Sequence, residues 1–179
     1  MQQLIEDLLS YSRVKSKPLS TDKTDLNSVV ADALTDFEVV IKEKSAVVEV
    51  GKLCELKIVR FQFRQLLYNL ISNSLKVCAE GRRLLITIKC IVASAEKLKL
   101  AELAPGTDYC HIVFTDNGIG FDPQYKERIF EVFQRLHEYD EYKGTGIGLA
   151  ICKRIVDNHN GIITATGKPG KGMRFDIYI

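Results

Sequence analysis

Two glycine-rich loops in the second half of this sequence constrain its fold more than any other feature. The first, Asp116-Asn-Gly-Ile-Gly120, directly follows a β-branched run with the character of a strand. The second, Gly144-Thr-Gly-Ile-Gly-Leu-Ala150, opens an apolar stretch with helical spacing. Glycine lets a backbone approach another group closely. Each loop is therefore either a tight structural turn or a place where a ligand meets the backbone.

Length and charge narrow the class of protein. A chain of 179 residues suits one compact domain, or one domain with a short appendage. Lys and Arg total 25 against 23 Asp and Glu, a balance that argues against a nucleic-acid partner or an anionic membrane. The apolar runs are far shorter than the ~20 residues of a membrane span, and the N-terminus lacks the basic start of a signal peptide. We therefore expect a soluble cytoplasmic protein without direct membrane contact.

The cysteines have irregular spacing and form no CxxC pair. An odd number of cysteines, most of them inside apolar runs, is typical of small reduced residues in the core of an intracellular protein. We interpret them in this way and favour burial over metal binding. They are Cys54, Cys78, Cys90, Cys110 and Cys152.

Hydrophobic periodicity predicts helices and strands that are mixed rather than strictly alternating. This order favours an α+β two-layer sandwich, in which a mixed, mostly antiparallel sheet of about five strands is covered on one face by three helices, with a short extra helix at the N-terminus. The expected helices are 1–16, 27–44, 61–77, a short one over 124–133, and one from the second glycine loop to Asn160-Gly161. The expected strands are 46–50, 84–92, 109–115, 162–166 and 173–179, with residues 93–108 as a connection or small insertion.

The helix expected over 61–77 carries a polar face whose residues could bind a ligand. Asn69, Asn73 and Lys76 stand at positions i, i+4 and i+7 and so share one side of the helix. An amide oxygen is a hard, neutral ligand that suits Mg²⁺, and a lysine beside it would neutralise phosphate charge. Taken alone, the same pattern also fits an ordinary solvated helix face.

Each glycine loop also has two interpretations. A carboxylate at the end of a strand, as at Asp116, can accept a hydrogen bond from an exocyclic amine such as that of adenine, yet Asp-Asn-Gly is also a common turn. The second loop matches neither the P-loop pattern nor the dinucleotide-binding glycine pattern. It is therefore a phosphate cradle of another type, formed by N–H groups at a helix start, or a structural loop.

The order of these segments carries a family resemblance. The asparagine-bearing helix, the first glycine loop, Phe130-Glu-Val-Phe133 and the second glycine loop follow one another along the chain. This ensemble resembles the N, G1, F and G2 boxes of the ATP-binding domain of sensor histidine kinases, especially multidomain and phytochrome-type bacterial ones, within the wider family of gyrase, Hsp90 and MutL. The resemblance implies a Bergerat-type ATP fold over 25–179, the end of the second helix of a dimerisation and phosphoacceptor domain over 1–17, and a linker over 18–24.

The resemblance also implies a role for individual residues. Asp116 would bind the adenine amine, Asn73 would hold Mg²⁺, and Lys76 would add positive charge near the phosphates. Arg135 would contact the γ-phosphate, and Phe130 and Phe133 would pack the start of a mobile lid against the core. Asn69, Lys76 and Arg135 are the implied catalytic residues. The implied nucleotide-binding residues are Asn69, Asn73, Lys76, Asp116, Gly118, Ile119, Gly120, Gly144, Thr145, Gly146, Ile147, Gly148 and Leu149.

One position bears on mechanism. In the ATPases of the wider family, a glutamate four residues before the metal-binding asparagine activates water, and Asn69 stands at that place. An amide is no base near neutral pH, so transfer to a separate nucleophile is favoured over hydrolysis. None of the histidines (His111, His137 and His159) lies in the acidic start of a phosphoacceptor helix.

The implied partners are therefore the phosphoacceptor and dimerisation domain of a parent kinase and, downstream, the receiver domain of a response regulator. Two alternatives stay open: a nucleotide-binding regulatory module without catalysis, and a serine-directed kinase of the anti-sigma-factor type. Departures from the family pattern at Val77, where an aromatic residue is common, and at Met173, where threonine is common, permit reduced ATP affinity.

Overall fold

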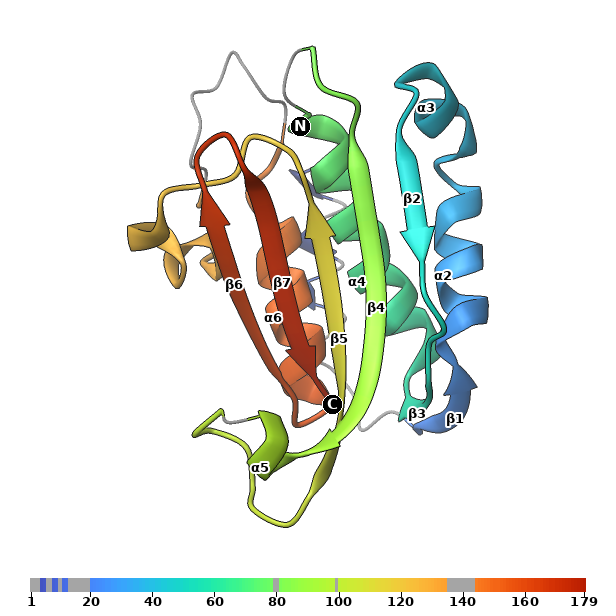
Figure 1. Ribbon diagram of the computed structural model, residues 1–179, viewed down its shortest axis with the longest axis vertical. Coiled ribbons are helices and arrows are strands. Elements are labelled where there is room, and N and C mark those ends of the chain that lie inside the picture. Colours follow the sequence, from blue (N-terminus) through green and yellow to red (C-terminus); the bar gives the residue numbers. More distant parts are fainter. Residues whose placement is uncertain are drawn as a thin grey trace.

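A five-stranded sheet with helices on one face forms the body of the computed structural model, which describes residues 4–5, 8–9, 11–12, 20–78, 81–98, 100–134 and 144–179. The strand order is β2–β4–β5–β7–β6; β2 runs parallel to β4, and the other neighbours are antiparallel. Helices α6, α4 and α2 cover one face (Figure 1), which confirms the predicted two-layer α+β sandwich. The strands of this sheet are β2 (Val47–Val50), β4 (Leu85–Ser94), β5 (Asp108–Asp116), β6 (Ile162–Lys168) and β7 (Gly172–Tyr178), and the helices are α2 (Leu26–Thr35), α3 (Glu38–Glu43), α4 (Arg60–Lys76), α5 (Ala95–Leu98) and α6 (Gly148–Asn158). Within the described ranges, no helix combines the length and the apolar character that a bilayer crossing needs.

The central strands are held in register by an alternating pattern. Every second residue of β5 from Cys110 onward is buried, whereas the residues between them are half-buried. Because side chains alternate between the faces of a strand, Ile112 and Phe114 pack into the core beneath the helices. The same spacing brings Asp116, the last residue of β5, to an inward position with an exposed fraction of only 7%. A polar side chain therefore stands where the pattern requires an apolar one.

Two of the predicted helices differ from those observed. The helix expected over 27–44 is divided, because a tight turn from Leu34 to Phe37 brings the Phe37 ring into the core between α2 and α3. The helix expected over 124–133 is instead a pair of 3₁₀ turns, Pro123–Tyr125 and Arg128–Phe130. Ile129 is buried, and Tyr125 and Phe130 pack partly against the core, so these two short turns bring apolar side chains to the core without one continuous helix.

A second, two-stranded sheet was not expected. It pairs β1 (Asp22–Asp25) with β3 (Glu55–Ile58) in antiparallel register, and β1 overlaps the linker predicted over 18–24. At the N-terminus, the described residues Leu4, Ile5, Leu8, Leu9, Tyr11 and Ser12 are helical. Leu4 and Tyr11 pack partly against the core, and the remainder of the helix predicted over 1–16 lies outside the described residues.

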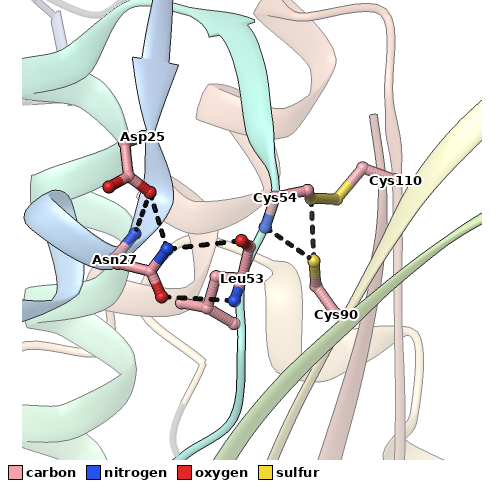
Figure 2. Close-up of a disulfide and its surroundings, with 6 residues drawn as sticks. All are labelled: Asp25, Asn27, Leu53, Cys54, Cys90 and Cys110. Atoms are coloured by element: carbon pink, nitrogen blue, oxygen red, sulfur yellow. Dashed lines mark hydrogen bonds between the residues drawn. A yellow bond between two sulfur atoms is a disulfide. The ribbon is translucent and has the colours of Figure 1, made fainter.

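The expectation that every cysteine is reduced is wrong for two of them. A disulfide joins Cys54, just before β3, to Cys110 near the start of β5 (Figure 2). The two residues are 56 positions apart, so the contact is created by the tertiary fold and has no local sequence signal. Cys152, by contrast, is fully buried as predicted, and burial raises the pKa of its thiol to about 12.

His159 ties the end of α6 to the start of α4. Its Nδ1 lies 2.7 Å from the carbonyl oxygen of Ile155, and the backbone N–H of Val59 donates to its Nε2 at 3.0 Å. These two contacts together require a neutral ring with its proton on Nδ1. Burial lowers the pKa of His159 below its usual 6.5. His159 thus has a structural role.

This arrangement predicts a loss of stability in mild acid. Because the folded state lowers the His159 pKa, its contribution to stability is fully present above the unfolded value of about 6.5 and is lost as the pH falls through the folded value. We expect the free energy of unfolding, measured by urea titration, to decrease from about pH 7 to about pH 5. The His159→Gln variant should be less stable near neutrality but show a shallower decrease; an unchanged slope would contradict the assignment.

Candidate functional site

Three of the predicted site residues, Asn69, Asn73 and Lys76, lie on helix α4. Asn69 and Asn73 are half-buried and Lys76 is exposed, and at 1.5 Å per residue the three span about 10 Å of the helix. The side-chain amide of Asn73 forms no hydrogen bond with a described residue, and Lys76 forms no ion pair with one. Both side chains therefore face solvent with donors and acceptors unused within the part of the chain that the structure describes.

Asp116 lies beside the C-terminal end of this helix. Its Oδ2 accepts a hydrogen bond from the Ser74 hydroxyl at 2.8 Å, and its Oδ1 accepts one from the Gly118 backbone N–H at 2.9 Å. Burial raises the pKa of this carboxyl group above its usual value, while these hydrogen bonds and one from the Met173 backbone oppose that shift. Because a carboxylate oxygen has two lone pairs, Asp116 keeps capacity for a further donor.

The first glycine loop is packed between α4 and the β6–β7 hairpin. Its Ile119 N–H donates to the carbonyl oxygen of Val77 at 3.2 Å, and a Cβ at Gly118 would lie only 2.8 Å from that oxygen. Gly120 has a φ of +68°, and a Cβ there would collide with the backbone of Lys168. Both glycines are therefore required for the loop to reach this position.

The second glycine loop connects two parts of the predicted site. The carbonyl oxygen of Gly146, whose φ is +73°, accepts from the backbone N–H of Phe133 at 3.0 Å. The carbonyl oxygen of Gly148, the first residue of α6, accepts from Asn69 Nδ2 at 3.1 Å. Ile147 between them is fully buried. The start of α6 is thereby fixed against both α4 and the phenylalanine segment.

The remaining members of the second loop lie at its edges. Leu149 packs partly against the core, Thr145 is half-buried, and Gly144 is exposed with no heavy atom within 4 Å of a Cβ built on it. Arg135 lies outside the described residues, as do the other residues of the segment 135–143.

The two phenylalanines before that segment differ from each other. Phe130 packs against the core, with its ring centroid 6.4 Å from that of Phe175, as expected. The expected core packing of Phe133 is wrong, since 59% of this residue is exposed. Its backbone has a φ of +65° and is held by Gly146, so the backbone rather than the ring anchors this point.

Sequence reasoning missed the residues that support Asp116 and its loop. Ser74 is 1% exposed, and its position on the apolar face of α4 was the available signal. Asn117 joins the loop to the start of β4: its Oδ1 accepts from the Leu85 N–H at 2.8 Å, and its Nδ2 donates to the Arg83 carbonyl at 3.0 Å. Arg82 donates to the carbonyl oxygens of Asn117 and Gly170, a contact between distant segments without a local signal.

Comparison with known proteins identifies the family of this chain. The sequence profile of the "Histidine kinase-, DNA gyrase B-, and HSP90-like ATPase" family matches residues 59–179, the part that contains both glycine loops and α4. The chain belongs to this family. It is 39% identical over 175 residues to the phytochrome-like protein Cph1 of Synechocystis, covering 98% of this chain and 22% of that protein. It is also 32% identical to the sensor histidine kinase RppB of the same organism, covering all of this chain and 38% of that one.

Solved structures share the fold of this ATPase-family chain. The crystal structure of full-length ShkA in complex with AMPPNP superposes with a TM-score of 0.71 at 22% identity, covering 98% of this chain and 35% of that one. The Acinetobacter baumannii histidine kinase AdeS superposes with a TM-score of 0.70 at 23% identity, covering 99% and 77%. This chain spans about a fifth of the length of the first curated relatives that it matches.

The second loop offers a matched pair of glycine substitutions. Gly146→Ala places a side chain at positive φ and against the Phe133 backbone, so we expect a loss of at least about 1–2 kcal/mol in the free energy of unfolding. Gly144→Ala has open space around it and should change that free energy by less than about 0.5 kcal/mol. Urea titration of both variants measures the difference; equal stabilities would contradict the described loop.

Proposed function

We propose that this chain binds ATP with Mg²⁺ and transfers the γ-phosphoryl group to a histidine on a separate phosphoacceptor and dimerisation domain. The phosphate then passes to an aspartate in the receiver domain of a response regulator, and the reaction takes place in the cytoplasm. The observation that carries this proposal is the buried Asp116 carboxylate, held by Ser74 and Gly118 beside Asn73 and Lys76, whose side chains have no partner among the described residues.

The adenine base is proposed to bind at Asp116. Its carboxylate is pre-oriented by two internal hydrogen bonds and retains free lone pairs. The exocyclic amine of adenine donates hydrogen bonds, whereas guanine carries a carbonyl oxygen at the same ring position. Gly118, Ile119 and Gly120 form the adjoining backbone, and the absence of side chains on the two glycines lets this loop pack against Val77 and Lys168, next to Asp116.

The phosphates and the metal ion are proposed to lie beside Asn73 and Lys76 of α4. The amide oxygen of Asn73 is a hard donor without a described partner, so it fits Mg²⁺, which neutralises phosphate charge when bound. Lys76 adds a cationic donor on the same face. The second glycine loop, from Gly144 to Leu149, presents the backbone N–H groups at the start of α6, an arrangement that favours anions.

The residues around the site favour transfer over hydrolysis. The Asn69 amide is already bonded to Gly148 and Gln65, and it cannot remove a proton from water. Asn69 is thus a positioning residue that holds the second loop against α4. Arg135 remains our prediction for the contact with the γ-phosphate, a role in which a guanidinium stabilises charge during transfer.

The acceptor is proposed to come from another domain because the described histidines are engaged elsewhere. His111 Nε2 lies 2.7 Å from Asp176 Oδ1, and its ring stacks on Tyr178. His159 joins α6 to α4 through both ring nitrogens. The helical residues at the N-terminus, among them Leu4 and Tyr11, are proposed to be the end of the second helix of that acceptor domain.

A transfer assay tests this function. The chain is mixed with a separate histidine-containing phosphoacceptor domain and radiolabelled ATP, and we expect label on the acceptor that is lost in acid and kept in base. Asp116→Asn should lower the transfer rate at subsaturating ATP by roughly 100-fold, because it exchanges a charged acceptor for an amide. Asp157→Asn, on the exposed side of α6, is the matched control and should transfer normally.

The outcomes separate the alternatives. Acid-stable label on serine would indicate a serine-directed kinase, and saturable ATP binding without transfer would indicate a regulatory module; either result overturns the proposal. The chain alone should hydrolyse ATP slowly, and rapid hydrolysis that survives Asn69→Ala would also contradict it.

A further inference from the structure

Three cysteines meet at the end of the sheet opposite the nucleotide site. Cys110 is the third residue of β5 and Asp116 is its last, so six residues of extended strand, about 20 Å, separate the two ends. Cys90 comes from β4, and Cys54 from the segment that precedes β3 (Figure 2). The proposed ATP-binding residues are therefore too distant to explain why these three cysteines lie together.

The sulfur atoms are close enough to share one ligand. The Sγ atoms of Cys54, Cys90 and Cys110 all lie within 4.8 Å of one another. Cys90 Sγ is 2.7 Å from Cys54 Sγ, and it also accepts a hydrogen bond from the Cys54 backbone N–H at 3.0 Å.

Strand register and a short hydrogen-bond network hold the three residues in place. Cys90 pairs with Ile112 and Cys110 pairs with Val92, which makes the two cysteines diagonal neighbours on one face of the sheet. Cys54 comes from a segment that is fixed to α2. The Asn27 side chain bonds both the N–H and the carbonyl of Leu53. The Leu26 N–H donates to the carbonyl of Cys54. Asp25 in turn orients the Asn27 amide at 2.7 Å (Figure 2).

We propose that Cys54, Cys90 and Cys110, when all three are reduced, form a three-thiolate site for one soft d¹⁰ cation such as Zn²⁺ or Cu⁺, and that the Cys54–Cys110 disulfide is the closed state of this site. Binding one cation to three thiols releases three protons and forms three metal–sulfur bonds. Opening the site takes two electrons and two protons from a dithiol reductant, which becomes a disulfide while the Cys54–Cys110 bond breaks.

The donor set and its surroundings specify this class of ligand. A Zn–S bond of about 2.3 Å requires sulfurs about 3.8 Å apart in tetrahedral geometry, which lies inside the spread of this cluster. Thiolates prefer soft cations, and no carboxylate or imidazole belongs to the cluster in the part of the chain that the structure describes. Cys54 and Cys90 are only half-buried, so an ion and a water as fourth ligand can reach them.

Metal titration of the reduced full chain tests the proposal. The chain is reduced with a phosphine under anaerobic conditions and titrated with Cd²⁺, whose bonds to thiolates give an ultraviolet charge-transfer band, and then with Zn²⁺ and Cu⁺ in competition with a chelator. We expect one cation per chain. Each of Cys54→Ser, Cys90→Ser and Cys110→Ser should weaken binding at least about 100-fold, more than the loss of an outer-shell partner.

Two controls make the result specific to the cluster. Cys78→Ser changes another half-buried cysteine and should leave the affinity unchanged. Oxidised chain, with the Cys54–Cys110 disulfide verified by mass spectrometry, should bind at least about 100-fold more weakly than reduced chain. Circular dichroism establishes that each variant is folded before titration.

Several results would overturn the proposal. One is binding by the folded Cys90→Ser variant with the affinity of the unsubstituted chain, and another is an equal loss in Cys78→Ser. Equal affinity of the oxidised and reduced chains would refute the disulfide as the closed state. None of these outcomes depends on ATP, so they are distinguishable from a failure of the proposed kinase function.

Discussion

The hydrogen bonds around the buried carboxylate of Asp116 are the interaction on which the rest of this structure depends. A carboxylate removed from water is costly unless donors surround it. Here the donors come from α4, through Ser74, and from the glycine loop, through Gly118. These donors reach the carboxylate only when β5, α4 and the first glycine loop pack in one relative position. The same position defines the proposed adenine-binding site.

Helix α4 extends this constraint along the whole candidate site. Its C-terminal end contacts the first glycine loop through Ser74 and Val77, and Asn69, nearer the middle, contacts the start of α6 through Gly148. The opposite side of the helix is packed into the core by residues such as Leu66 and Leu70. One rigid element thus sets the spacing between both glycine loops, and it also carries the half-buried Asn73 and the exposed Lys76.

Sequence reasoning succeeded where the signal was local. The alternation in β5, the apolar face of α4 and the stop at the end of α6 were all readable, because periodicity and turn chemistry depend on near neighbours. The end of α6 is an example. The Asn-Gly pair predicted that the helix stops there, and Asn160 adopts a positive φ just after the last helical turn. The asparagine and glycine positions of the candidate site were predicted from short motifs in the same way, and their binding roles stay predictions.

Features that depend on tertiary contacts were beyond such reasoning. The strand β1 has the sequence Asp-Lys-Thr-Asp, which carries no strand pattern and is stabilised by pairing with β3. The break between α2 and α3 goes together with a tight turn that buries the Phe37 ring in the core. The support of Asp116 by Ser74, 42 residues earlier, and the meeting of Cys54 with Cys110 likewise require the completed fold.

Our central proposal is that the Asp116 carboxylate recognises the exocyclic amine of adenine. Calorimetric titration of the chain with ATP and with inosine triphosphate, both as magnesium complexes, tests it most directly, because inosine carries an oxygen where adenine carries that amine. We expect inosine triphosphate to bind roughly 10- to 100-fold more weakly, the effect of replacing a hydrogen bond to a charged group with two facing acceptors. Equal affinity for the two nucleotides would contradict the claim.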